Sequence, residues 1–436
     1  MMNDIVEYIK TFLTGADEET TSAIGYTSDE GSYDQYAVVI KDSGFFDDKT
    51  YGSKASLPAL PLKQWEEIPI LFGEGFTEKR GDTIIIHADI IAGTYYLISR
   101  YEEMVRSDIR DQYGRFTGKE SLPYRAGFID RPIIEEWGAQ LRIKMREAGL
   151  NMPEPTPGIN KVYLTHDVDQ MAHYRTIRGM LGGVLRGIKR RKESQMALKS
   201  YFGGVIFDPW YTFPFMYKLD DDLRRKMGAN RCEIITFVRA GGNKMKEDKP
   251  FPVLTHPDYK TLIRYTRRKK IQFGLHTSFE AGCNPEKIPQ EVANLSKHTR
   301  QEITYNRNHY LNSKEPADFE HLIANGITDD FSMGYADMAG FRLGTCKPVR
   351  WINPLTRQLT NLTLHSLIIM DCTLHEKKYM YMNAFDAYQY CVRLADCVEK
   401  YNGDFILLWH NTMMEKSAKL YHRELYRDLL QYLHEK

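Results

Sequence analysis

Seven short apolar runs in the second part of the chain constrain its fold more than any other feature of the sequence. They are rich in β-branched and aromatic residues, and the segments between them are long enough to form helices. Strands that alternate with helices are typical of parallel α/β architectures. We therefore predict an α/β fold with a parallel sheet or barrel. The runs are KVYLTHD, CEIITFV, KIQFGLH, EITYNRNHY, GITDDFS, SLIIMD and GDFILLWH.

A proline-rich stretch separates these runs from an earlier part of the chain. NMPEPTPGIN, residues 151–160, holds three prolines within five residues, and a residue before proline is biased toward extended conformations. Such composition is typical of a linker. We predict a smaller N-terminal α/β accessory domain at residues 1–155 and a barrel-like domain at 156–436.

The first part of the chain also contains strand-like runs. QYAVVI, IPILFG and DTIIIHADIIAGTYYLI are rich in β-branched and aromatic residues. Apolar residues at helical spacing predict an amphipathic helix at the N-terminus and a second helix that starts at Pro132.

Composition narrows the classes of partner and location. The 436 residues carry a formal net charge of +1, so bulk electrostatics favour no nucleic-acid partner. The six cysteines form no CxxC pair, which indicates reduced thiols. No segment reaches the roughly 18 consecutive apolar residues of a membrane-spanning helix. We expect a soluble, cytoplasmic protein.

One basic run, RGIKRRK at Arg186 to Lys192, lies in an amphipathic context with Met180, Leu181 and Val184. A solvated helix face is the commoner outcome for such a run. The alternative interpretation is peripheral contact with an anionic membrane surface or with a phosphate-bearing substrate.

Ionisable residues follow several of the seven runs directly. In YLTHDVD, alternation of side chains puts Asp167 and Asp169 on one face and His166 on the other. The two aspartates are about 6–7 Å apart at the backbone, from a rise of roughly 3.3 Å per residue. They can therefore share a site, while His166 points away and is expected to be structural.

The same pattern recurs at four other runs. Ligands bind at the carboxyl ends of strands in parallel α/β folds, so these side chains are expected to meet. Each one alone could be structural, as a hydrogen-bonded histidine, a helix cap or a surface ion pair. The joint pattern favours a functional site. The residues are His276 after IQFGLH, Arg307 and His309 in EITYNRNHY, Asp371 after LIIM, and His410 after FILLW.

These motifs resemble those of the NodB-type polysaccharide deacetylases, carbohydrate esterase family four. THDVD is similar to the first motif, which implies that Asp167 is the general base and Asp169 a metal ligand. HTSFE approaches the second motif, H-[ST]-x-x-H, and makes His276 a metal ligand. Arg307 matches the arginine that braces the base, and His410 in ILLWH matches the general acid. Asp371 completes our set of candidate catalytic residues.

The resemblance covers residues from about 159 to 436 and points to a divergent bacterial branch with an N-terminal accessory domain. It implies a distorted (β/α)7 barrel and a hydrolase that removes N- or O-acetyl groups from a carbohydrate in surface-glycan biosynthesis. It also implies a divalent metal, with Zn²⁺ preferred over other transition metals, and an acetylated carbohydrate as substrate.

Two departures from the family pattern leave the third metal ligand open. Glu280 stands where the second motif has its second histidine, and His309 replaces the usual proline of the third motif. Asp169, His276 and Glu280 would preserve the motif spacing, since positions i and i+4 share one face of a helical turn. His309, which strand alternation places beside Arg307, is the alternative. We prefer it because the phrase HYL belongs to the whole branch that the chain resembles, whereas the position of Glu280 is less fixed there.

Other functions remain open at this point. The missing histidine motivates a glycan-binding homologue with an empty or inactive site. The superfamily also includes amidases that act on non-sugar amides. A glycosidase using Asp167 and Asp371 as paired carboxylates ranks last, because His276 and His410 would then have no role.

Overall fold

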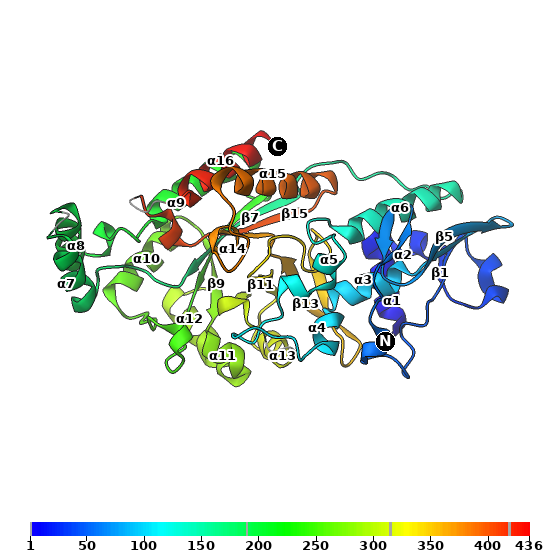
Figure 1. Cartoon of the computed structure of the whole chain (residues 1–436), viewed down its shortest axis with the longest axis horizontal. Helices are drawn as coiled ribbons and strands as arrows, with labels where there is room; N and C mark the ends of the chain where they lie inside the picture. Colours follow the sequence, from blue (N-terminus) through cyan, green and yellow to red (C-terminus); the bar gives the residue numbers. More distant parts are fainter. Residues whose placement is uncertain (1, 189–190, 314–315, 417–419) are drawn as a thin grey trace. The chain divides into compact units, whose positions relative to one another are not determined.

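The computed structural model describes residues 2–188, 191–313, 316–416 and 420–436, and Figure 1 labels its elements along the chain. The chain forms two compact units, each made of separate segments. Unit 1 comprises Met1–Gly158, Met333–Ile368 and Cys397–Gly403, and unit 2 comprises Ile159–Ser332, Ile369–Asp396 and Asp404–Lys436. The division into domains at 1–155 and 156–436 stays a prediction.

Unit 1 contains a four-stranded sheet in the order β1-β2-β6-β5, in which only β5 runs antiparallel to its neighbour. The predicted runs QYAVVI and IPILFG supply β2 and β4. Helices α1 and α6 confirm the two predicted helices, and α6 begins directly after Pro132. The strands are β1 (Ile24–Tyr26), β2 (Val38–Ile40), β3 (Lys63–Trp65), β4 (Ile68–Ile70), β5 (Gly73–Arg80), β6 (Thr83–Ala88), β12 (Val349–Asn353) and β13 (Gln358–Ser366); the helices are α1 (Met2–Thr14), α2 (Glu18–Thr21), α3 (Ile90–Ile98), α4 (Tyr101–Val105), α5 (Leu122–Arg125) and α6 (Ile133–Glu147).

The run DTIIIHADIIAGTYYLI is strand only in its first half, so its interpretation as one strand-like run was wrong. Strand β6 ends at Ala88, and the carboxylate of Asp89 caps α3 by accepting a hydrogen bond from the Ala92 N–H at 2.9 Å. Every residue of α3 is buried. An all-apolar segment has no polar face to reveal a helical period, which is why its composition resembled a strand.

Unit 2 is built on seven parallel strands in the order β11-β10-β9-β8-β7-β15-β14. Each of the seven apolar runs forms one of them, which confirms the α/β class. β7 lies inside the sheet between β8 and β15, so the end of the THDVD run is flanked on both sides. The strands are β7 (Lys161–Val168), β8 (Cys232–Val238), β9 (Gln272–Thr277), β10 (Tyr305–Asn308), β11 (Asp329–Met333), β14 (Ile369–Met370) and β15 (Asp404–Leu408).

Helices connect most of these strands, as a parallel sheet requires, but between β11 and β14 the chain passes through β12 and β13. Helices α9 and α16 pack against each other beside β7 and β15 (Figure 1). Among the described residues of unit 2, no pairing joins β11 to β14, so a closed (β/α)7 barrel stays a prediction. The helices are α7 (Ile177–Arg186), α8 (Arg191–Gly203), α9 (Phe213–Met227), α10 (Pro257–Arg268), α11 (Phe279–Cys283), α12 (Ile288–Thr299), α13 (Ala317–Ala324), α14 (Asp371–His375), α15 (Ala384–Lys400) and α16 (His422–Glu435).

Two general features bear on the expectations from composition. All six cysteines carry free thiols. None of the helices in the described ranges combines the length and apolar character needed to cross a bilayer.

Candidate metal centre and acid–base groups

The carboxyl ends of β7, β9 and β10 bring five ionisable residues of unit 2 together. Asp167 lies in β7 and Asp169 just after it, while His276 lies near the end of β9. Arg307 lies in β10, opposite His276 in the parallel register, and His309 follows the strand. The structure therefore gathers residues that are up to 142 positions apart in sequence at one edge of the sheet.

Asp169, His276 and His309 form a compact group of donor atoms. Asp169 Oδ1 lies 3.1 Å from His276 Nε2 and 3.5 Å from His309 Nε2. One ligand atom from each residue lies within 4.8 Å of the other two. Two imidazole nitrogens and one carboxylate oxygen are a donor set that Zn²⁺ accepts in catalytic sites.

The far nitrogens of both histidines are held by hydrogen bonds. His276 Nδ1 lies 2.9 Å from the carbonyl oxygen of Arg307, and His309 Nδ1 lies 2.9 Å from Asp248 Oδ1. Such partners fix the tautomer with hydrogen on Nδ1 and direct the Nε2 lone pair at the centre, as in metal sites generally. The residues present therefore fit a bound divalent cation.

A strained turn sets the position of His309. Tyr310 and Leu311, which directly follow it, have φ angles of 62° and 56°. Left-handed backbone is unfavourable for bulky residues and persists only where the surroundings hold it. The Asn308 side chain spans this turn by donating to the Asn312 carbonyl at 2.9 Å. The turn thus carries His309 back toward the strand ends rather than onward along the strand direction.

Asp167 is held in place by Arg307 beneath the group of donor atoms. Arg307 Nη1 donates to Asp167 Oδ1 at 3.1 Å and to Thr165 Oγ1 at 2.7 Å. Its guanidinium also lies over the Phe237 ring at 4.5 Å. The other oxygen of Asp167 is 3.6 Å from His276 Nε2. Burial lowers the pKa of Arg307, opposed by the Asp167 charge, but arginine remains cationic in proteins and keeps a positive charge beside Asp167.

His410 faces the same group from the end of β15. Its Nδ1 lies 2.7 Å from Asp371 Oδ1, and its backbone N–H donates to Asp371 Oδ2 at 2.6 Å. Its Nε2 lies 3.5 Å from Asp169 Oδ2. Burial lowers the pKa of His410, but the Asp371 charge outweighs it and holds the pKa well above its usual value. Asp371 therefore favours the protonated form of His410, whose Nε2 lies on the side of Asp169.

The charges around Asp169 keep it ionised. Burial raises its pKa, but His309, His276 and His410 together hold the pKa well below its usual range. Burial also opposes the charge on both ligand histidines. At His276 the charges of Asp167 and Asp169 outweigh burial, so the pKa of His276 is raised. At His309 burial outweighs the charge of Asp169, so the pKa of His309 is lowered.

Glu280, the other candidate third ligand, does not join this group. Its carboxylate accepts hydrogen bonds from the backbone N–H groups of Asn243 and Lys244, at 2.9 and 3.1 Å, and pairs with Lys287. The spacing argument for Glu280 assumed one helical turn, but His276 is still in β9, whereas Glu280 lies in α11. Positions i and i+4 share a face only when both are helical.

Asp248 is a functional candidate that the sequence pattern did not reveal. Besides holding His309, it accepts hydrogen bonds from the N–H groups of Phe279 and Glu280 at 2.8 and 2.9 Å, at the start of α11. It is fully buried. It lies in the loop segment KEDKP. No apolar run comes directly before it, so it does not match the pattern of ionisable residues at strand ends.

His166 points away from the site, in agreement with strand alternation. Its two ring nitrogens lie 3.0 Å from the Trp409 carbonyl oxygen and 2.9 Å from Asp220 Oδ2. Asp220 also accepts a hydrogen bond from the Tyr426 hydroxyl at 2.6 Å. All three side chains are buried, so His166 belongs to a core network.

A second group of donor atoms adjoins the first but suits a metal less well. Asp371, Cys372 and His410 bring three ligand atoms within 4.8 Å of one another. Both oxygens of Asp371 are occupied by His410, and burial raises the pKa of the Cys372 thiol to about 12. A protonated thiol is a poor ligand.

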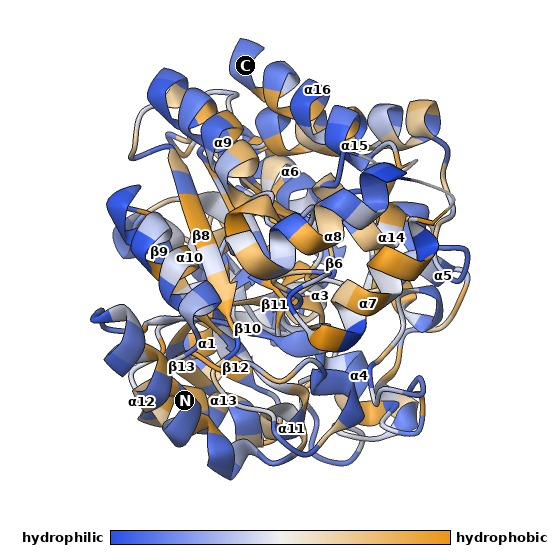
Figure 2. Cartoon of the chain, turned by 90° about the vertical axis from the view of Figure 1, so that its left-hand side faces the viewer, coloured by the Kyte–Doolittle hydropathy of each residue, from blue (hydrophilic) through white to orange (hydrophobic). Residues whose placement is uncertain are grey.

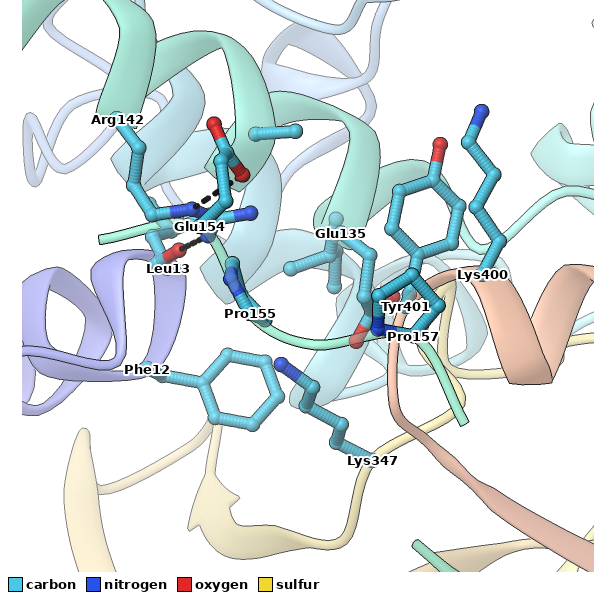
Figure 3. Close-up of a pocket in the computed structure, with 12 residues that line it drawn as sticks. Phe12, Leu13, Glu135, Arg142, Glu154, Pro155, Pro157, Lys347, Lys400 and Tyr401 are labelled. Atoms are coloured by element: carbon cyan, nitrogen blue, oxygen red, sulfur yellow. Dashed lines mark hydrogen bonds and ion pairs between the residues drawn. The ribbon is translucent and has the colours of Figure 1, made fainter. Parts of the chain in front are cut away.

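Unit 1 contains a separate cavity of about 330 Å³ (Figure 3). Arg142 and Glu154 meet on one side of it, and Glu135 and Tyr401 lie on the other. Glu135 accepts a hydrogen bond from the Thr345 hydroxyl, but its Oε2 is buried without a hydrogen-bond partner. Burial raises the pKa of Glu135 to about 7.

A family model matches the first part of the chain. Residues 3–149 match the model of a family of unknown function (DUF7033). No curated protein matches the chain.

Three solved structures overlap part of the chain at low scores. A protein described as a polysaccharide deacetylase from Mycobacterium smegmatis is 11% identical, covers 65% of this chain and 89% of its own, and has a TM-score of 0.40. One from Bordetella bronchiseptica, described as a polysaccharide deacetylase involved in O-antigen biosynthesis, is 12% identical over 63% and 84% of the two chains, with a TM-score of 0.29. A 4-alpha-glucanotransferase from Thermococcus litoralis is 9% identical over 65% and 38%, with a TM-score of 0.36. Overlaps at this level decide nothing about the reaction.

Proposed function

We propose that the protein is a metal-dependent hydrolase that removes N- or O-acetyl groups from a carbohydrate. One observation carries the proposal. The donor atoms of Asp169, His276 and His309 converge, and a carboxylate held by arginine and an imidazole held by aspartate flank them. A ligand set with a base on one side and an acid on the other suits hydrolysis of an acyl bond.

Asp169, His276 and His309 would hold the cation. When bound there, a divalent ion such as Zn²⁺ supplies a Lewis acid for the acetyl carbonyl and lowers the pKa of water toward 7. The two histidines are oriented for this by the Arg307 carbonyl and by Asp248. These hydrogen bonds orient the two rings with Nε2 toward Asp169.

Asp167 is the candidate general base. Its Oδ1 is occupied by Arg307, so its Oδ2, on the side of His276, is the atom that takes a proton from the attacking water. Arg307 holds the carboxylate by its hydrogen bond to Oδ1, which leaves Oδ2 on the side of His276.

His410 is the candidate general acid. It holds its proton at Nε2, because Nδ1 faces Asp371 and the Asp371 charge raises its pKa. The proton passes to the leaving nitrogen of an amide or the leaving oxygen of an ester as the acyl bond breaks. Acetate and the free sugar amine or hydroxyl are the products.

Metal content and turnover test the proposal together. The protein, purified without chelator and supplied with Zn²⁺, is assayed for acetate released from a panel of N- and O-acetylated amino sugars. We expect one metal ion per chain and turnover, with Asp167→Asn retaining metal but losing about two to four orders of magnitude in rate. His276→Gln should lose the metal itself. Glu280→Gln is the matched control and should retain both metal and rate.

Other outcomes point to other functions. A protein that takes up no metal and releases no acetate, but binds the sugars, would be a glycan-binding homologue. Turnover of formamide-type or cyclic amide substrates in place of acetylated sugars would make it an amidase on a non-sugar substrate. Full activity of Asp167→Asn would overturn the assignment of the base.

A further inference from the structure

The helical hairpin of α7 and α8, with the short turn Val205–Phe207 that follows it, exposes an unusual amount of apolar surface. Eight of the seventeen large apolar side chains that are exposed in the described part of the chain lie within residues 177–207. The hairpin lies at one end of unit 2, away from β7, β8 and β9 (Figure 1). A concentration of this kind marks an interaction surface.

Helix α7 carries three of these side chains on one face. Ile177, Leu181 and Leu185 follow one another at intervals of four residues, which places them along one side of the helix, and Ile188 comes just after the helix ends. They are between 51% and 78% exposed. In Figure 2, which faces this end of the chain, α7 and α8 lie toward the viewer and both carry hydrophobic (orange) positions.

The inner face of the hairpin is made of small residues. A Cβ placed on Gly183 would lie 2.6 Å from the Ala197 Cβ and 2.6 Å from the Tyr174 ring, so α7 and α8 approach each other closely there. Ser194 on α8 donates to the Val184 carbonyl at 3.0 Å. The small residues thus form the helix contact and the large apolar ones face out, the reverse of a helix packed on a soluble core.

The second half of the hairpin continues the apolar surface. Leu198 and Phe202 are exposed one turn apart on α8, and Ile206 and Phe207 are exposed in the turn after it. Lys199 Nζ lies over the Phe207 ring at 4.6 Å. Aromatic rings beside lysine are typical of helices that lie in the interface of a membrane.

Most of the charged side chains around this surface are positive. Within the described residues of 177–207, five side chains are cationic and only Glu193 is acidic, and Glu193 is paired with Arg186. Part of the predicted basic run, residues 189 and 190, lies outside the described residues. A basic rim around an apolar face complements an anionic lipid headgroup layer. The cations are Arg178, Arg186, Arg191, Lys192 and Lys199.

The base of the hairpin is clamped to the rest of unit 2. Arg175 donates to the carbonyls of Ser200 and Tyr201 at 2.7 and 2.6 Å and pairs with Asp258 at 2.8 Å. Asp208 accepts hydrogen bonds from the Tyr174 N–H and the Ser200 hydroxyl. These contacts fix the segment that connects the end of β7 to the hairpin.

We propose that the α7–α8 hairpin is a membrane-docking surface that places its apolar face in the interface of an anionic bilayer. The apolar side chains enter the boundary between headgroups and acyl chains, and the arginines and lysines contact the anionic headgroups. This proposal stands independently of the reaction proposed above.

Vesicle sedimentation of the full chain tests this docking. Vesicles of phosphatidylcholine alone are compared with an equimolar mixture of phosphatidylcholine and phosphatidylglycerol. The wild-type protein should sediment with the mixed vesicles, bind phosphatidylcholine alone about tenfold or more weakly, and dissociate as salt rises.

Two pairs of substitutions separate the apolar and charged contributions. Leu185→Asn with Ile188→Asn should weaken binding about tenfold or more, while Leu355→Asn, equally exposed outside the hairpin, should change nothing. Arg178→Glu with Lys192→Glu should weaken binding by a similar factor. The same charge change at Lys54 and Lys63 is the control, and circular dichroism checks that each variant is folded.

The outcomes are decisive in both directions. Failure of the wild-type chain to bind mixed vesicles, or equal loss of binding in the hairpin variants and their controls, would overturn the proposal. A protein partner that covers this face instead would give the first of these results. Acetate release from a soluble sugar should be the same in all these variants, so that assay tests the proposed reaction separately.

Discussion

Replacement of Glu135 by glutamine should make the protein more stable at neutral and alkaline pH. The Glu135 side chain is 5% exposed beside the cavity of unit 1, and one of its oxygens is buried without a hydrogen-bond partner. Burial raises its pKa to about 7, although Lys347 and the Thr345 hydroxyl act in the opposite direction. A glutamine keeps the shape and the acceptor oxygen for Thr345 but has no charge to bury.

The magnitude follows from the two pKa values. In the unfolded chain Glu135 has its ordinary pKa of 4.5, whereas burial raises the pKa to about 7 in the folded protein. The folded state therefore binds more protons between these values, and stability falls as pH rises through this window. The wild-type protein should lose about 3 kcal/mol of unfolding free energy across it. Glu135→Gln should not lose this contribution.

Urea unfolding at about pH 5 and about pH 8 measures the effect. Tryptophan fluorescence follows the transition, with the buried Trp137 of α6 as a probe near the substitution. The variant should gain about 2–3 kcal/mol on the wild type between the two pH values. Glu147→Gln, at the exposed end of the same helix, is the control and should follow the wild-type curve. A stability difference between Glu135→Gln and wild type that stays constant with pH would refute the argument from burial.

Three further substitutions test the site. Asp371→Asn removes the charge that raises the pKa of His410, so the alkaline limb of the rate profile should move to lower pH; an unmoved limb would exclude His410 as the acid. Asp248→Asn weakens the hydrogen bond that orients His309 and should lower Zn²⁺ affinity about tenfold or more, measured by competition with a chromogenic chelator; unchanged affinity would contradict that role. His166→Phe leaves a buried carboxylate without its partner and should cost about 3 kcal/mol in urea unfolding, while metal content stays the same.

Most strands of unit 2 could be predicted from the sequence because they are short apolar runs with a polar boundary, although β10 (YNRN) and β11 (DDFSM) are largely polar. Burial on both faces of a parallel sheet demands such runs, and the intervening helices separate them clearly. The same reasoning failed at DTIIIHADIIAGTYYLI, where a buried strand runs directly into a buried helix. Periodicity carries no information when every position is apolar.

The third metal ligand shows that spacing along the sequence does not always predict which side chains meet in the fold. Glu280 has the expected distance from His276 along the chain, but the chain changes from strand to helix between them. His309 has no motif spacing to His276, yet the parallel pairing of β9 with β10 and the turn after Asn308 bring the two rings together, with centroids 5.0 Å apart. Proximity here follows from strand order, which the sequence pattern does not specify.

The partners of the reacting groups were the hardest to predict, for a related reason. Three candidate groups each depend on a buried residue of opposite or complementary charge: Asp167 on Arg307, His410 on Asp371 and His309 on Asp248. The first two partners follow strands of the same sheet, so the strand-end pattern found them. Asp248 comes from a loop and is recognised only by its contacts. Such a partner sets the orientation and charge of the group that it contacts. A strand-end pattern can therefore locate the reacting groups of such a site, but it does not reveal the partners that come from loops.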